Sequence, residues 1–126
     1  MPIEGYRQLE AWQVGMQFVE HCYSATKDFD VSERFGLTSQ IRRSAVSIPS
    51  NLAEGYCRRT ARAYLNHVGI ALDSHGELET CLELAVRLRL LPGRTHQALA
   101  AECGVPGRLL TRLWQSLDRK INSSQS

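Results

Sequence analysis

The sequence lacks the features that define membrane-spanning, secreted and β-rich proteins. No apolar run approaches the roughly 18–20 uninterrupted residues of a membrane-spanning helix. The first residues, MPIEGYRQLEAW, contain no basic segment followed by an apolar run, which argues against a signal peptide. Aromatic residues make up only 7% of the chain, and no segment is rich in alternating valine, isoleucine or threonine, so strands are not favoured. We expect a cytoplasmic protein without membrane contact.

Motifs for catalysis are also missing. The sequence has no H-E-x-x-H zinc motif, no G-x-x-x-x-G-K-[ST] phosphate loop and no G-x-S-x-G nucleophile elbow. A di-iron site in a helical bundle needs paired E-x-x-H motifs, and none occur. Glu77 and Glu79 are two residues apart and cannot share a helix face, so they do not form an acid/base pair. We therefore expect no enzymatic activity and no cofactor, with an unrecognised site between subunits as the alternative.

Cysteine and histidine spacings do not predict a metal site. The four cysteines, at positions 22, 57, 81 and 103, form no C-x-x-C pair and no zinc-ligand spacing with a histidine. We expect reduced, mostly buried thiols. His75 and Glu79 are one helical turn apart and could hold part of a metal site. His75 lies on an apolar stripe, however, which favours a packed core histidine.

Helical periodicity is the main positive signal, and it is clearest over Leu37–Tyr56, with the sequence LTSQIRRSAVSIPSNLAEGY. Apolar residues recur there at spacings of three and four, which is typical of one helix face: Leu37, Ile41, Ala45, Ile48 and Leu52. Pro49 lacks an N–H and crowds the carbonyl four residues back, so a kink or break is expected near residues 45–49. The remaining helices are interpreted as covering this one.

The periodicity predicts four helices, over about residues 6–27, 33–56, 60–91 and 94–121, in a single domain that spans 1–126. Three short connections make neighbouring helices antiparallel, so the expected fold class is all-α, an up-down-up-down four-helix bundle. A kink or short break is expected in the fourth helix at Gly104–Gly107, and a disordered tail over 122–126. Gly69 and Gly76 share one face of the third helix, which predicts close packing by the second helix or by another subunit.

The first helix has two apolar faces. One face forms a three-four repeat, which predicts the seam that packs on the other helices: Leu9, Trp12, Met16, Val19 and Tyr23. Ala11, Val14 and Phe18 add apolar surface beside or away from that seam. A second apolar face indicates either a fully surrounded helix or a contact between subunits.

The positive charge is distributed unevenly. The net charge of +2 is too small to argue for nucleic acid by itself. Residues 37–67 carry five arginines against one glutamate, a net charge of +4, and residues 94–126 carry five basic against two acidic residues, a net charge of +3. In an up-down bundle the second turn lies at the same end as the start of the first helix and the end of the fourth. This end, the basic pole, gathers Arg7, Arg58, Arg59, Arg62, Arg119 and Lys120. The pole is either a phosphate-binding surface or an ordinary solvated helix end.

Arg42 and Arg43 each have two interpretations. A basic helix face can contact phosphates, whereas an arginine among small residues often reaches a carboxylate on the next helix. We favour a structural ion pair for Arg43, with Glu77 or Glu79 as its partner. Arg42 is kept as a second-choice residue for nucleic-acid contact.

Several ordered strings resemble a known family. They are Glu10 with Trp12, the string RFGLTSQIRRSAVSIPSNLAEGY over Arg34–Tyr56, the Arg58–Arg59 pair, and IALDSHGELET over Ile70–Thr80. From about Tyr6 to Leu91 the chain resembles the four-helix-bundle family named for 23S rRNA intervening-sequence proteins. The resemblance implies a bundle that assembles into a ring, usually a pentamer. It also implies relatedness to the accessory protein of diversity-generating retroelements, a basic bundle that binds nucleic acid and a reverse transcriptase.

These observations predict a non-enzymatic, ring-forming homo-oligomer that binds RNA, DNA or a ribonucleoprotein weakly through the basic pole. The candidate nucleic-acid residues are Arg58, Arg59, Arg62, Arg42, Arg119 and Lys120. The alternative is a protein-interaction scaffold with a protein partner and no nucleic-acid role, which the modest net charge favours.

Overall fold

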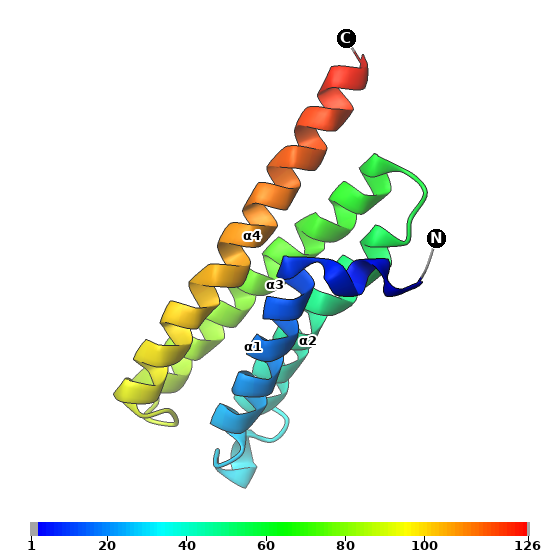
Figure 1. Ribbon diagram of the computed structural model, residues 1–126. Helices are drawn as coiled ribbons and strands as arrows, with labels where there is room; N and C mark the ends of the chain where they lie inside the picture. Colours follow the sequence, from blue (N-terminus) through cyan, green and yellow to red (C-terminus); the bar gives the residue numbers. More distant parts are fainter. Residues whose placement is uncertain (1–2, 126) are drawn as a thin grey trace.

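The computed structural model describes residues 3–125, and no strand occurs in that part of the chain. In chain order the elements are a 3-10 helix η1 (Ile3–Gln8), α1 (Glu10–Thr26), a 3-10 helix η2 (Val31–Glu33), α2 (Leu37–Tyr56), α3 (Ala61–Arg87) and α4 (Gly93–Gln125). Successive α-helices run in opposite directions (Figure 1). The predicted all-α four-helix bundle is therefore confirmed. None of the helices over residues 3–125 combines the length and apolar character needed to cross a membrane.

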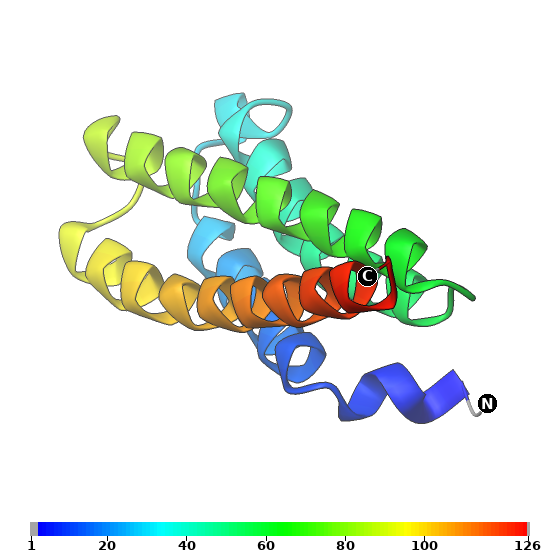
Figure 2. The ribbon, with the colours of Figure 1, turned by 90° about the horizontal axis from the view of Figure 1, so that it is seen from above.

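Each helix packs against its neighbours in sequence, and α4 closes the bundle against α1. The contact between α2 and α3 is the most extensive, and that between α1 and α4 is the smallest. Viewed from above, α3 and α4 lie side by side, and η1 projects to one side of them (Figure 2). The α2–α3 pair is therefore the structural centre of the bundle.

The core is built around the stripe predicted on α2. Ile41, Ala45, Ile48 and Leu52 are fully buried. They meet apolar side chains from the other helices, among them Phe18 and Cys22 of α1, Val68, Leu78 and Leu82 of α3, and Leu99, Cys103 and Leu110 of α4. Removing this apolar surface from water is the main driving force for the fold.

The face of α1 that enters the core is not the predicted seam. Ala11, Phe18 and Cys22 are buried, whereas Met16 and Tyr23 are 41% and 42% exposed. The two faces are similarly apolar, so their pattern alone could not decide which one faces α2 and α4. The predicted seam is therefore wrong at these positions, and α1 keeps an apolar face at the surface.

The first and second helices begin later than predicted because the backbone leaves the helical conformation before them. Leu9 is extended, with φ −67° and ψ 125°, and separates η1 from α1. Gly36, with φ −106° and ψ −117°, separates η2 from α2. The third helix ends earlier than predicted, at Arg87, and Arg89 then takes the left-handed conformation with φ 62°.

Both internal prolines lie within continuous helices. Pro49 is inside α2 and Pro106 is inside α4. The predicted short break at Gly104–Gly107 does not occur, since α4 is continuous over Gly93–Gln125, and the alternative of a kink there stays a prediction. Residues 122–125 of the predicted tail lie within α4, and Ser126 lies outside the described residues. No glycine or proline follows Gly107 to stop the helix earlier.

The glycines that allow close approach are not the predicted ones. A Cβ added at Gly69 or Gly76 would meet no atom within 4 Å, so α2 does not pack closely there and that prediction is wrong. A Cβ added at Gly107 would lie 2.6 Å from Cε1 of His75, and one at Gly55 would lie 2.7 Å from Cβ of His67. Close packing thus joins α4 to α3 and α2 to α3 at these two points. A contact of Gly69 and Gly76 with another subunit stays a prediction.

Candidate nucleic-acid interface

The predicted basic pole lies at one end of the bundle. Arg58 and Arg59 lie in the turn after α2, and Arg62 is in the first turn of α3; all three are exposed. The C-terminal part of α4 reaches the same end (Figure 1). Nη2 of Arg58 is 3.4 Å from Oε1 of Glu54, an exposed ion pair of small energetic value. Over residues 3–125, Arg59 and Arg62 form no ion pair within 4.0 Å, so their charges face solvent.

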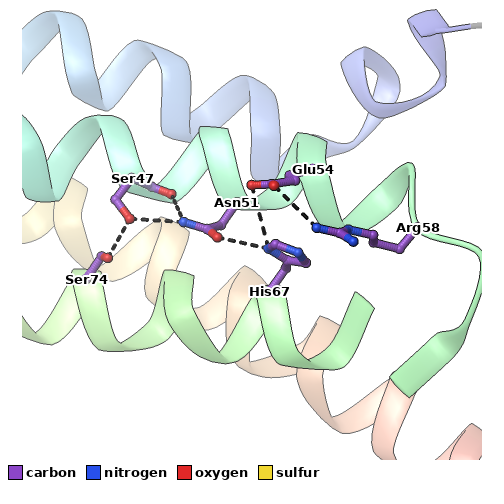
Figure 3. Close-up of polar contacts among 6 residues, drawn as sticks. All are labelled: Ser47, Asn51, Glu54, Arg58, His67 and Ser74. Carbon is purple, nitrogen blue, oxygen red and sulfur yellow. Dashed lines mark hydrogen bonds and ion pairs between the residues drawn. The ribbon is translucent and has the colours of Figure 1, made fainter. Parts of the chain in front are cut away.

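A row of polar contacts lies across the α2–α3 interface and extends as far as Arg58 of the basic pole (Figure 3). Ser74 Oγ donates to Ser47 Oγ at 2.7 Å, and Asn51 Nδ2 donates to the Ser47 carbonyl at 2.9 Å. Asn51 therefore turns its oxygen toward His67 Nδ1, 3.0 Å away. Since Oδ1 can only accept, Nδ1 of His67 carries the proton in this pair. The contacts satisfy polar groups between the two helices and fix the register of the turn that bears the arginines.

The contacts end at Glu54, which lies between two basic groups. Its Oε2 is 3.9 Å from Nδ1 of His67, while its Oε1 faces Arg58. Glu54 therefore neutralises part of the positive charge at the turn. This leaves Arg59 and Arg62 as the stronger candidates for a phosphate.

A second basic surface lies near the other end of the bundle. It is a groove of about 630 Å³, the basic-aromatic groove, lined by Tyr23, Arg34, Phe35, Thr38, Ser39, Arg42, Arg43, Val46 and Ser47. Three of these residues are arginines, and no acidic residue is among them. Phe35 is 90% exposed and Tyr23 is 42% exposed. Positive charge, aromatic rings and hydroxyl groups thus share one concave surface.

The two adjacent arginines differ in how they are held. Nε of Arg42 donates to Thr26 Oγ1 at 2.9 Å, and its guanidinium lies 4.4 Å from the centroid of the Tyr23 ring. Arg42 therefore fastens α2 to the end of α1. Arg43 is exposed and forms no hydrogen bond or ion pair within the described residues. Its charge is available to a ligand in the groove.

The predicted ion pair of Arg43 is not formed. Arg43 and Glu77 line a common polar groove between α2 and α3, but no contact within 4.0 Å joins Arg43 to Glu77 or Glu79 in the described part of the chain. Glu79 instead lies 3.5 Å from Nδ1 of His75, one turn earlier on the same helix. In the structure it is Arg42, and not Arg43, whose side chain has partners on a neighbouring helix.

Comparison with known proteins decides the family. The family described as 23S rRNA-intervening sequence protein matches residues 7–112. The chain belongs to this family. The bundle is similar to a crystal structure of a protein of unknown function from the S23 ribosomal protein family of Bacteroides thetaiotaomicron. That match has a TM-score of 0.77 and 22% identity, and it covers 83% of this chain and 95% of the other. No curated protein matches the sequence significantly.

The comparisons support the family resemblance and the fold. At 22% identity the likeness to the Bacteroides protein concerns the fold alone. Neither description names an enzymatic activity or a ligand. The function proposed for this family member is therefore based on the chemistry of its surface residues.

Sequence reasoning missed the groove residues other than Arg42 and Arg43, which are Tyr23, Arg34, Phe35, Thr38, Ser39, Val46 and Ser47. The apolar repeat places Tyr23 in the core seam, and the predicted helix over residues 33–56 includes residues 34–35. One signal was present in the sequence, because Arg34-Phe35 precedes Arg42-Arg43 by eight residues, about two helical turns. In the folded chain the connection formed by η2 and Gly36 places Arg34 and Phe35 in the lining of the groove.

The cysteines of this family member are free, as predicted. Cys22, Cys81 and Cys103 are buried, and Cys57 is exposed at the turn after α2. Burial raises the pKa of the Cys22 and Cys103 thiols to about 12, so both are protonated at neutral pH. Cys103 also lies beside His75 and Glu79, a cluster that the cysteine and histidine spacings do not predict.

Proposed function

We propose that this family member binds single-stranded RNA or DNA with little sequence preference in the basic-aromatic groove. The observation that carries the proposal is the groove's lining of three arginines and two exposed aromatic rings, without an acidic side chain. Single strands are bound in this way, with phosphates on basic side chains and bases stacked on aromatic rings. In the proposal Arg34 and Arg43 contact phosphates, and a base stacks on Phe35.

The basic pole is a second contact in this proposal. Arg59 and Arg62 are exposed and unpaired in the described part of the chain. Arg58 lies in the same turn, and the proposal also includes Arg119 and Lys120 of the C-terminal part of α4, which reaches this end of the bundle (Figure 1). A strand that leaves the groove along α2 would meet this pole. Binding at both sites is non-enzymatic, because it needs only charge and stacking.

The proposal includes a homo-oligomeric ring, the assembly that the family resemblance implies. A closed ring requires two different complementary surfaces on each subunit. Two groups of apolar residues are candidates for these surfaces. One is an apolar groove between α1 and α2, lined by Trp12, Met16, Val19, Val46 and Pro49, among others, and the other is formed by the exposed Ile70 and Leu84 of α3 with Leu88 just after it. A pentamer would repeat every nucleic-acid contact and strengthen weak binding through avidity.

The test uses a fluorescent oligouridine, a matching oligodeoxythymidine and an RNA duplex as ligands, over a series of salt concentrations. We expect both single strands to bind better than the duplex, and binding to weaken as salt rises. Arg43→Glu should lower affinity at least about tenfold and reduce the slope of log K against log salt by about 0.7 for each phosphate that the variant no longer neutralises. Phe35→Ala should lower affinity by about 1–3 kcal/mol.

A control variant separates the groove from general surface effects. Arg94→Glu makes the same charge change at an exposed arginine outside the groove and the pole. It should leave oligonucleotide affinity close to that of the parent protein. Equal losses of oligonucleotide affinity in Arg43→Glu and Arg94→Glu, or an affinity that does not change with salt concentration, would contradict binding in the groove.

The second candidate function is a protein-interaction scaffold without nucleic acid, which the exposed apolar residues favour. Light scattering with and without oligouridine distinguishes the two. A ring whose mass increases with oligouridine at low salt supports our proposal, whereas a ring whose mass does not change with oligouridine supports the scaffold. A monomer would rule out the ring. If Phe35→Ala changes the mass of the free protein, Phe35 belongs to the subunit interface.

A further inference from the structure

The strongest unexplained cluster lies between α3 and α4, away from the proposed nucleic-acid surfaces. His75 is 8% exposed, and its imidazole ring lies against α4 at Gly107. Any larger residue at 107 would collide with the ring, because an added Cβ would lie 2.6–2.8 Å from Cε1 and Nε2. The ring is therefore held in one place by close packing.

Both nitrogens of this ring face oxygen atoms. Nε2 is 2.6 Å from the carbonyl oxygen of Cys103, and Nδ1 is 3.5 Å from Oε1 of Glu79. A neutral imidazole has one N–H, so it can donate to only one of these two acceptors. In the neutral ring the lone pair of the other nitrogen then faces a second oxygen, and either a proton on that nitrogen or a metal ion between the two atoms removes the repulsion.

The spacing of the potential ligand atoms suits a small metal ion. Two ligands about 2.0–2.2 Å from a tetrahedral Zn²⁺ lie about 3.3–3.6 Å apart. His75 Nδ1 and Glu79 Oε1 are 3.5 Å apart, which is in this range. Cys103 Sγ is 3.4 Å from the other ring nitrogen, Nε2, so Sγ must turn toward Nδ1 to share the same ion with Glu79. One potential ligand atom from each of the three residues can be chosen so that all lie within 4.8 Å of one another, and no other such group occurs among the described residues.

We propose that His75, Glu79 and Cys103 form a Zn²⁺-binding site that joins α3 to α4. Imidazole, carboxylate and thiolate are all ligands that Zn²⁺ accepts. One ring nitrogen binds the ion, and the N–H on the other donates to the adjacent oxygen, as metal-bound histidines commonly do. Glu79 has the freedom to complete the site, because its side chain is 58% exposed.

The surroundings leave room for a further ligand. The cluster opens on a cavity of about 480 Å³ that is lined by Leu72, His75, Glu79, Gly104, Gly107, Arg108, Thr111 and Arg112. Water from this cavity can supply the remaining position. With both Glu79 and Cys103 ionised the bound ion is neutralised, so Arg108 and Arg112 do not face excess positive charge.

Binding of the ion must displace a proton. Zn²⁺ binds cysteine as the thiolate, so the ion replaces the thiol proton of Cys103. Metal binding at this site does not depend on nucleic-acid binding in the groove, so the two are tested separately.

Cobalt titration tests the site, because tetrahedral Co²⁺ replaces Zn²⁺ and reports thiolate ligation through its near-ultraviolet charge-transfer band. The protein carries Cys57→Ser, to remove the exposed thiol, and no histidine tag; it is first treated with a chelator. We expect a thiolate–Co²⁺ band that saturates at one ion per chain and disappears when Zn²⁺ is added. Zn²⁺ should also raise the thermal unfolding temperature.

Three variants in the same background make the test specific. Cys103→Ser should abolish the band, and Glu79→Gln should weaken Co²⁺ affinity about 10–100-fold. Cys81→Ser, which alters another buried thiol, should leave both unchanged. Circular dichroism confirms that each variant is folded before titration. Absence of a saturable band, or a band that persists at full strength in Cys103→Ser, would overturn the proposal.

Discussion

At the scale of single residues, sequence neighbours can have unrelated roles. Arg42 and Arg43 are adjacent on α2, yet successive residues on a helix point about 100° apart. Arg42 therefore reaches α1, where it meets Thr26 and the ring of Tyr23, while Arg43 turns to the groove and solvent. This difference in partner makes one residue structural and leaves the other free to bind.

The two arginines should consequently differ in their effect on stability. Arg42→Ala removes a hydrogen bond from a charged donor and a cation–π contact, and we expect it to lower the free energy of unfolding by about 1–2 kcal/mol. Arg43→Ala should change it by less than about 0.5 kcal/mol. Urea unfolding followed by circular dichroism measures both. Equal effects of the two variants would contradict the structural role of Arg42.

At the scale of helices, close approach between α3 and α4 depends on Gly107. The buried ring of His75 occupies the space where a side chain at position 107 would begin. Gly76, one residue after His75, faces open space instead. Packing thus requires glycine at position 107, whereas at position 76 a larger residue would fit.

Alanine at these two glycines should have opposite effects. Gly107→Ala forces the His75 ring or α4 to move, which costs about 1–3 kcal/mol. Alanine's better helix propensity returns up to about 1 kcal/mol, so we expect a net loss of stability. Gly76→Ala gains the helix propensity without a collision and should stabilise the protein by up to about 1 kcal/mol. Thermal unfolding of both variants is the measurement, and stabilisation by Gly107→Ala would show that the ring is not confined.

At the scale of the whole molecule, buried thiols link stability to pH. Cys22 on α1 and Cys103 on α4 lie in the core where the bundle closes. The pKa of each is raised from 9.0 to about 12, chiefly by burial, and the nearby Cys103 adds to the shift of Cys22. A raised pKa means that the folded protein binds the thiol proton more tightly than the unfolded chain does.

The bundle should therefore lose stability in alkaline solution. The thiol contribution is fully present below pH 9.0 and falls as the pH rises toward 12, because only the unfolded thiols ionise in that window. Urea unfolding at increasing pH measures the slope. Cys22→Ser should flatten the slope, since serine does not titrate there. An unchanged slope in Cys22→Ser would contradict this account; Tyr64, whose pKa is about 12, adds a further alkaline contribution in every variant.

The sequence by itself determined the helical class, the apolar stripe of α2 and the approximate extent of the four helices, because these follow from local spacing along the chain. Only the tertiary structure decided which apolar face of α1 enters the core, since that depends on the rotation of the helix against α2 and α4. The same holds for the groove between Tyr23 and Arg34 and for the cluster of His75 with Cys103. Both bring together residues from different helices or connections, whose meeting is set by packing rather than by spacing.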